Sequence, residues 1–358
     1  MEMIDRHLAF WRNDPIDRPL AGLFLQEYFV EDIYRIAREG DIVTPEMVKA
    51  DMFFDLFAER HIALEAYKQD MVRPVEPLNC MPWLEGILGM GLRVHGQSVW
   101  AEPLLAKDKS IQSFQPGWCD AWFEVTVAFV RDLVERFHPQ TPVSGPFLRG
   151  PADVVAAMIG TGRFCLELVD HPQEIERLLH ICARAWSEIY NEVIKIIPPW
   201  NGGYILGARW IFTPGECVYA SEDATVLLSP KMYKEIILPV NQSMAARFPF
   251  GFMHRHSASM QHLDLLLEMP PGWALEVTMD PTGPTVSEIL AVLQKIQAAR
   301  RPLILFGMNK PEQLRNLIHG LTPEGLCLIS QADTATQAKQ LLAEITGEEA
   351  GRIWVNDK

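Results

Sequence analysis

The sequence predicts an α/β fold, a (β/α)8 TIM barrel with N-terminal helical extensions, and three observations predict it. Short apolar runs rich in β-forming residues alternate with longer segments of helical spacing, a pattern typical of parallel strands joined by crossover helices. There are eight such runs, the number of strands in this kind of barrel. The 358 residues contain no Ser/Gly-rich linker or low-complexity tract, so we expect a single barrel domain over residues 1–358.

The predicted elements are more regular in the second half of the chain than in the first. The predicted strands span residues 20–25, 71–76, 142–147, 203–212, 250–254, 274–279, 302–307 and 326–330. Helical spacing follows in residues 229–246, 260–269, 285–299, 311–319 and 333–345. Apolar residues such as Ile289, Leu293 and Ile296 recur at three and four residues, so one stripe can face a sheet. Two longer helices, predicted at 44–67 and 118–137 around an irregular excursion near 81–103, extend the barrel.

Charge and composition exclude several classes of function. Lys and Arg number 32 against 46 Asp and Glu, a formal net charge of −14 with no basic run. Such a chain repels phosphate backbones and anionic lipids, so we expect neither a nucleic-acid partner nor a membrane partner. Six cysteines without a C-x-x-C pair indicate reduced thiols. The N-terminus has no signal-peptide pattern, and we therefore expect a cytoplasmic protein.

Two histidines stand at the carboxyl end of the fifth predicted strand, the end at which barrel enzymes carry their active sites. His254 and His256 are two residues apart in an extended segment, so their side chains project to the same side. Two imidazoles a few ångströms apart suit a divalent metal. An H-x-H pair alone is a weak signal, and two unrelated polar residues on a loop would give the same pattern.

Carboxylates at other predicted strand ends strengthen the interpretation as a metal site. Glu276 and Asp333 are the expected carboxylate ligands, with Asp280 as an alternative, because carboxylates beside two imidazoles complete a zinc-like site. Any one of them alone is more simply explained as a solvated loop residue. The other polar residues at strand ends are Gln26, Glu27, Glu76, Arg149, Asn309 and Gln331, and Arg209 lies within the fourth predicted strand.

Short motifs along essentially the whole chain resemble the uroporphyrinogen decarboxylase superfamily, in the order in which its members carry them. They are the opening Arg6 to Arg12 with the Pro15 to Pro19 segment, Gly145-Pro146, Asp170-His171-Pro172, Asp223 with the Leu228 to Tyr233 segment, His254-Arg255-His256-Ser257, and Gly325 to Ser330. The resemblance implies a (β/α)8 barrel, in agreement with the strand count.

Within that superfamily the chain is more similar to the corrinoid-linked methyltransferases than to the decarboxylases. Decarboxylases need no metal and hold a tetrapyrrole with an N-terminal Arg-Gln-Ala-Gly-Arg motif, whereas residues 24–29 here read Phe-Leu-Gln-Glu-Tyr-Phe. In the methyltransferase pattern His254 matches the metal-binding His, while His256 and Asp333 stand at or near the two Cys positions. This harder donor set favours a Lewis-acid role over activation of a thiolate.

The resemblance implies a metal-dependent methyltransferase that moves a methyl group between a small methylated substrate and a corrinoid on a partner protein, or a thiol. The expected cofactors are a divalent metal, with zinc as the first choice, and that corrinoid. Glu27 or Asp223 would protonate the leaving group. The assigned residues are His254, His256, Glu276 and Asp333 for the metal, Glu27, Asp223 and Arg209 for catalysis, and Arg149 and Asn309 for the cofactor.

Two alternatives remain open at this point. One is a metal-free decarboxylase-like lyase in which Arg149 and Arg209 hold the carboxylates of a tetrapyrrole. The other is a non-catalytic binder of a corrinoid or tetrapyrrole. The sequence also leaves the oligomeric state open, with a homodimer as one option.

Overall fold

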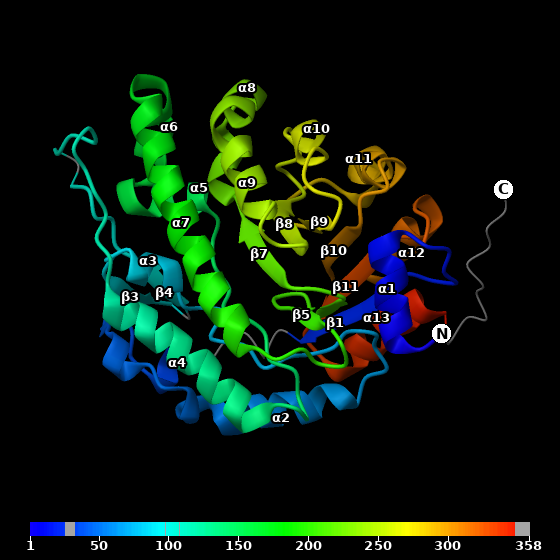
Figure 1. Cartoon of the computed structure of the whole chain (residues 1–358). Coiled ribbons are helices and arrows are strands. Elements are labelled where there is room, and N and C mark those ends of the chain that lie inside the picture. Colours follow the sequence, from blue (N-terminus) through cyan, green and yellow to red (C-terminus); the bar gives the residue numbers. More distant parts are fainter. Residues whose placement is uncertain (26–32, 97, 107, 348–358) are drawn as a thin grey trace.

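The computed structural model describes residues 1–25, 33–96, 98–106 and 108–347. Its centre is a parallel six-stranded sheet in the order β1-β11-β10-β9-β8-β7 (Figure 1). These strands are β1 (Leu20–Leu25), β7 (Cys217–Ser221), β8 (Phe250–His256), β9 (Trp273–Thr278), β10 (Leu303–Met308) and β11 (Leu326–Ala332). Almost every residue in them is buried, as expected for a parallel sheet covered on both faces.

Two further segments complete the barrel between β1 and β7. Val75 and Val143 form a single parallel bridge at the places of the second and third predicted strands. The Asp70 N–H donates to the Ala21 carbonyl of β1, and the Gly150 N–H donates to the Ser221 carbonyl of β7. Prolines at positions 74, 77, 142 and 146 remove the donors that a longer ladder would need. The predicted (β/α)8 architecture is confirmed, but the segments 71–76 and 142–147 lack regular strand pairing. We call a segment at a strand position of the barrel a stave, and these two are the irregular staves.

The fourth predicted strand, 203–212, is wrong. This segment is an antiparallel hairpin of β5 (Tyr204–Leu206) and β6 (Ile211–Thr213), and the parallel stave is the following β7. The hairpin turn contains Ala208 and Trp210 at φ values of 61° and 59°, a left-handed conformation that cannot continue a strand.

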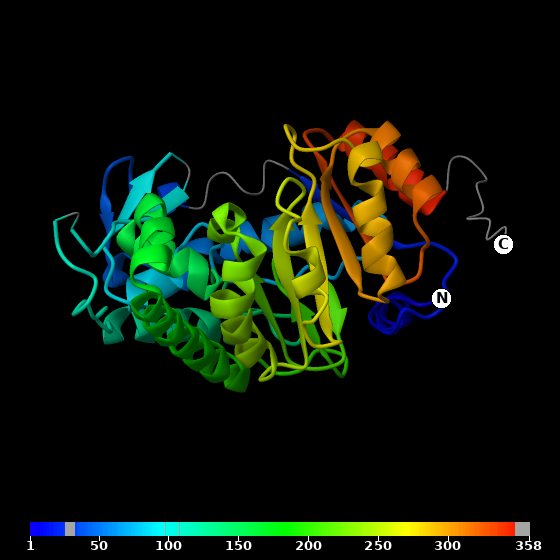
Figure 2. The same ribbon diagram turned by 90° about the horizontal axis from the view of Figure 1, so that it is seen from above.

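Helices cover the outside of the barrel, and the two views show them surrounding the sheet (Figures 1 and 2). They are α1 (Met3–Arg12), α2 (Phe54–Glu65), α3 (Trp83–Ile87), α4 (Asp120–Phe137), α5 (Pro151–Ile159), α6 (Thr161–Asp170), α7 (Pro172–Ile196), α8 (Pro230–Met232), α9 (Leu238–Ala245), α10 (Leu263–Leu266), α11 (Val286–Ala298), α12 (Pro311–Gly320) and α13 (Ala335–Thr346). Within the described residues, no helix has the length and apolarity needed to cross a lipid bilayer.

Most helix predictions agree with these bounds, and the exceptions have local causes. The predicted helix 229–246 contains a π-helical turn, Tyr233–Ile237, just before Pro239, and proline cannot donate the regular backbone bond. The predicted helix 44–67 begins as 3-10 turns and becomes α-helical only at Phe54. The predicted helix 260–269 is reduced to the four residues of α10.

The excursion predicted near 81–103 contains a small antiparallel sheet. Its strands are β2 (Ile42–Val43), β3 (Leu92–His95) and β4 (Ser98–Ala101), in that order. In Figure 1 this sheet lies at the opposite side of the molecule from α12 and α13.

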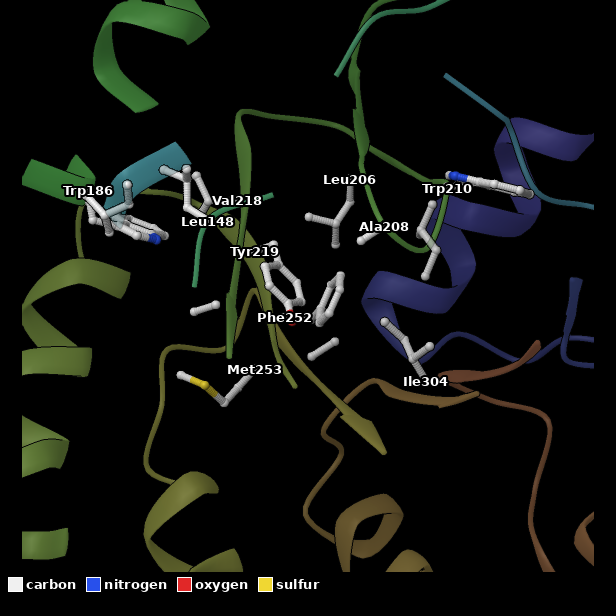
Figure 3. Packing of buried hydrophobic residues seen from close by; sticks show 14 of the residues in the cluster. Leu148, Trp186, Leu206, Ala208, Trp210, Val218, Tyr219, Phe252, Met253 and Ile304 are labelled. Atoms are coloured by element: carbon white, nitrogen blue, oxygen red, sulfur yellow. The ribbon is translucent and has the colours of Figure 1, made fainter. Parts of the chain in front are cut away.

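The barrel interior beside β7 and β8 is packed with aromatic rings. Tyr219 of β7 and Phe252 of β8 are register partners, and their ring centroids lie 4.8 Å apart (Figure 3). Burial of one such phenylalanine contributes about 1.5–3 kcal/mol. Because side chains alternate along a strand, His254 and His256 project from the same face of β8 as Phe252. Strand alternation therefore directs both histidines to the side of β8 on which these rings pack.

Candidate metal centre

Three side chains converge at the carboxyl end of β7 and β8. The Nε2 atoms of His254 and His256 lie 3.4 Å apart. Oδ1 of Asp223, two residues beyond β7, lies 3.6 Å from Nε2 of His254 and 3.7 Å from Nε2 of His256. In the described part of the chain, these three residues form the group of His, Cys, Asp and Glu side chains that could hold a metal ion.

The spacing of these three atoms fits one face of a tetrahedral site. At metal–ligand distances of about 2.0–2.1 Å, two ligands of a tetrahedral zinc ion lie about 3.4 Å apart. The observed separations of 3.4–3.7 Å match that value within a few tenths of an ångström. Two nitrogens and one oxygen suit zinc and similar divalent metals and leave a fourth position open.

A second carboxylate supports each imidazole from behind. Nδ1 of His254 contacts Oε2 of Glu276, and Nδ1 of His256 lies 2.6 Å from Oδ1 of Asp280. When Nδ1–H of each ring donates to its carboxylate, Nε2 carries no proton and keeps its lone pair. Both Nε2 atoms lie on the side of Asp223. Carboxylate–histidine pairs of this kind fix the tautomer and raise the basicity of a metal-ligating histidine. Glu276 and Asp280 thus occupy the position of supporting residues.

Arg209 keeps the Glu276 carboxylate ionised. Its Nε and Nη2 donate to Oε1 of Glu276 at 3.2 and 3.1 Å, and Oγ1 of Thr278 donates at 2.9 Å. Burial alone would raise the pKa of Glu276, but the charges of Arg209 and His254 outweigh it and lower that pKa to about 2. Burial lowers the pKa of His254, and the Glu276 carboxylate outweighs it, so that pKa is raised.

The strained hairpin turn explains how Arg209 reaches the barrel interior. Arg209 lies between Ala208 and Trp210, the two left-handed residues of the turn. Its guanidinium carbon lies 4.1 Å from the ring centroid of Phe306 and 5.8 Å from that of Phe252. A non-glycine residue at positive φ costs of order 1–3 kcal/mol, and such strain is concentrated at functional sites.

A cavity of about 610 Å³ adjoins Asp223. Its lining includes Met81, Trp100 of β4, Phe147 and Arg149, and it extends to the start of α6. Nε of Arg149 donates to Oε1 of the buried Glu85 at 2.5 Å. The volume and the mixture of aromatic and charged groups are those of a site for a small organic molecule.

The structure brings some of the predicted site residues together and separates others. Asp223 joins the two histidines, although the sequence suggested it as an acid. Glu276 lies one step behind His254 rather than among the three closest groups. Asp333 is an exposed residue after β11 and is not part of this group.

The remaining predicted residues lie outside the group of Asp223, His254 and His256. Arg149 lines the cavity, and Arg209 acts through Glu276. Asn309 is exposed after β10, where its backbone N–H donates to Gln313. Glu27 lies outside the described residues.

The comparisons with known proteins match the chain through its fold. No protein-family model matches, and no curated protein sequence does. The structure is similar to a methyltransferase from Methanosarcina mazei, with a TM-score of 0.63 and 13% identity over 97% of this chain and 99% of that one. It is also similar to a B12-independent methionine synthase from Shewanella sp. W3-18-1 in complex with selenomethionine, with a TM-score of 0.52 and 9% identity over 92% and 96%. These likenesses show an α/β barrel fold shared over nearly the whole chain.

Proposed function

We propose that this protein is a metal-dependent methyltransferase, related to the methyltransferase branch of the uroporphyrinogen decarboxylase superfamily. It would move a methyl group between a small methylated substrate and a corrinoid on a partner protein, or a thiol. The observation that carries the proposal is the group of Asp223, His254 and His256 beside a cavity of about 610 Å³. The named activities of the two structural neighbours, both methyl transfers, support it.

The chain's own residues would divide the work between holding the metal and holding the substrate. Asp223, His254 and His256 would bind a divalent cation, with zinc as the first choice. When bound, the cation would act as a Lewis acid on the heteroatom that carries the methyl group. Glu276 and Asp280 orient the imidazoles, and the cavity bordered by Asp223 holds the substrate. A ligating Asp223 is an anion, so of the two acids suggested by the sequence Glu27 remains as the proton donor.

The lyase alternative finds less support in the geometry. It requires Arg149 and Arg209 to hold substrate carboxylates. Both guanidinium groups already contact carboxylates of the chain, Glu85 and Glu276 respectively. We therefore do not propose a tetrapyrrole decarboxylase.

Metal content tests the proposal directly. Elemental analysis of protein purified without an affinity histidine tag should find about one equivalent of a divalent metal, lost in His254→Ala, His256→Ala and Asp223→Asn. Asp333→Asn removes a carboxylate outside the group and should keep the metal. The loaded protein should then transfer methyl groups from an ether or amine to free reduced cobalamin. A metal-free wild-type protein would exclude this function.

A further inference from the structure

Arg255 lies between the two candidate histidine ligands and projects to the opposite face of β8. Its side chain is only 1% exposed, and alternation along the strand directs it away from His254 and His256. A charged side chain buried this deeply requires partners in the protein. These partners show which parts of the molecule Arg255 connects.

One guanidinium group binds both segments that carry the candidate ligands. Nη1 of Arg255 donates to the Glu222 carbonyl at 3.2 Å and to Oγ1 of Thr225 at 2.8 Å. Both belong to the turn that contains Asp223. Nη2 donates to the Ser259 carbonyl at 3.0 Å, in the turn that follows the histidines of β8. Arg255 therefore cross-links the loop of Asp223 to the end of β8.

The loop is anchored on both sides of Asp223. Oε2 of Glu222 accepts hydrogen bonds from the Tyr233 hydroxyl at 2.6 Å and from Arg255 at 3.3 Å. The carboxylate of Asp153 accepts from Oγ of Ser221, before Asp223, at 2.6 Å and from the Ala224 N–H, after it, at 2.8 Å. Asp223 is thus held through its neighbours.

The side chain of Asp223 has little else to fix its position. It is 53% exposed, and within the described residues its carboxylate makes ion-pair contacts only with the two histidines. The distance between the carboxylate and the imidazoles is therefore set by the backbone of its loop. That backbone is bonded to Arg255.

We propose that Arg255, with Glu222, is a positioning residue for the metal centre, because it sets the distance of Asp223 from His254 and His256. This inference rests on the proposed function, since it requires a metal at these three residues. Supporting residues around a metal site typically contribute 10- to 100-fold to metal affinity. Loss of the Arg255 cross-link should have an effect of that size.

The test uses the double variant Glu222→Gln/Arg255→Met. Removing only one partner of a buried ion pair can prevent folding, whereas replacing both removes the charges together. The amide introduced at position 222 can still bond to the Tyr233 hydroxyl, but the guanidinium bonds to the two ligand segments are lost. Co²⁺ alone is added to the metal-free full-length protein, and its affinity and its visible absorption are measured beside thermal unfolding.

Arg301→Met is the matched control. Arg301 is also a buried arginine. It donates to the carbonyls of Pro270 and Trp273 at the amino end of β9, away from the candidate ligands at the carboxyl end of β8. It should lose stability and keep wild-type Co²⁺ binding. The double variant should bind Co²⁺ about 10- to 100-fold more weakly, with weakened bands, even where its unfolding temperature equals that of the control.

Each outcome decides a different claim. Weaker binding and altered bands in the double variant alone support the positioning role. Wild-type affinity and bands in a folded double variant would overturn the positioning role and leave the proposed function standing. Absence of Co²⁺ binding in the wild-type protein would overturn both.

Discussion

The two halves of the barrel differ in regularity, and the difference coincides with the division between metal and substrate in the proposed function. Strands β7 to β11 and β1 form a continuous parallel ladder, and this half carries His254, His256 and their supporting carboxylates. The staves at 71–76 and 142–147 share a single bridge, and most of the cavity lining comes from this side. A half with continuous strand pairing suits a metal site that needs its ligands within a few tenths of an ångström, whereas an irregular half can be hollowed for a substrate.

Among single variants that keep all three candidate ligands, the largest effect on metal affinity should come from neutralising the carboxylate behind His254. Glu276→Gln keeps all three candidate ligands but removes the anion that orients the imidazole and neutralises Arg209. We expect about a 10- to 100-fold loss of metal affinity, measured by competition with a chromophoric chelator. Glu85→Gln changes another buried glutamate paired with an arginine, but in the irregular half, and should leave the affinity unchanged. Equal losses in both variants would break the division between the halves.

Acid should weaken the irregular half through His7. Nε2 of His7 donates to the Asp70 carbonyl at 2.7 Å, and Nδ1 accepts from the Phe212 N–H at 3.1 Å. Both bonds require neutral imidazole, and burial lowers the pKa of His7 from about 6.5 to about 4. Because the unfolded chain takes up this proton first, the His7 contribution is complete above pH 6.5 and is lost as the pH falls toward 4, about 3 kcal/mol in total.

Urea unfolding between pH 7 and pH 4 measures this contribution. His7→Gln supplies an amide donor and acceptor without a titrating group, so its unfolding free energy should fall less steeply with acid than that of the wild type. His180→Gln alters an exposed histidine and should retain the wild-type slope. A wild-type slope in His7→Gln would refute the assignment.

A smaller effect is expected where the irregular half meets β7. A Cβ atom on Gly150 would lie 2.2 Å from the Ser221 carbonyl oxygen, so the start of α5 must shift in Gly150→Ala. We expect about 1–3 kcal/mol of destabilisation, measured by urea unfolding, together with weaker metal binding because Ser221 precedes the Asp223 loop. Gly162→Ala, with nothing within 4 Å of the added atom, is the control, and equal stability of both variants would contradict the close packing.

The smallest effect should separate substrate binding from metal binding. Trp100 lines the cavity and is 62% exposed, so Trp100→Ala removes an aromatic contact without opening the core. We expect KM for the methylated substrate to rise about 3- to 10-fold, while the metal content stays at the wild-type value. Loss of metal in this variant would show that the two halves are not independent.

The sequence predicts the architecture because both kinds of element leave a local pattern. Residues 250–254, 274–279 and 326–330 are recognisable as strands because buried parallel strands are short apolar runs, and the helices because their apolar residues recur at three and four. The prediction for 203–212 is wrong because its apolar residues suit a hairpin as well as a barrel strand, and only the left-handed residues Ala208 and Trp210 distinguish the two. That error also concealed β7, and with it the fact that Asp223 stands just beyond a strand end.

The candidate site is predictable from the sequence only in part. His254 and His256 can be paired from the sequence because alternation along one strand is a local property. The role of each carboxylate depends on distances between strands, which no local pattern contains. Glu276 of β9 lies opposite His254 in the ladder, so its side chain reaches Nδ1 and supports the ring. Asp223 approaches Nε2 from the loop after β7, the neighbour of β8 on the other side.

X-ray absorption at the metal edge of the natively loaded wild-type protein tests the central claim most directly. We predict a four-coordinate divalent metal with two imidazole nitrogens and carboxylate and solvent oxygens at about 2.0–2.2 Å. The His254→Ala variant should lose the signal. A sulfur shell at about 2.3 Å, or a wild-type protein without metal, would contradict the assignment of Asp223, His254 and His256 as the ligands.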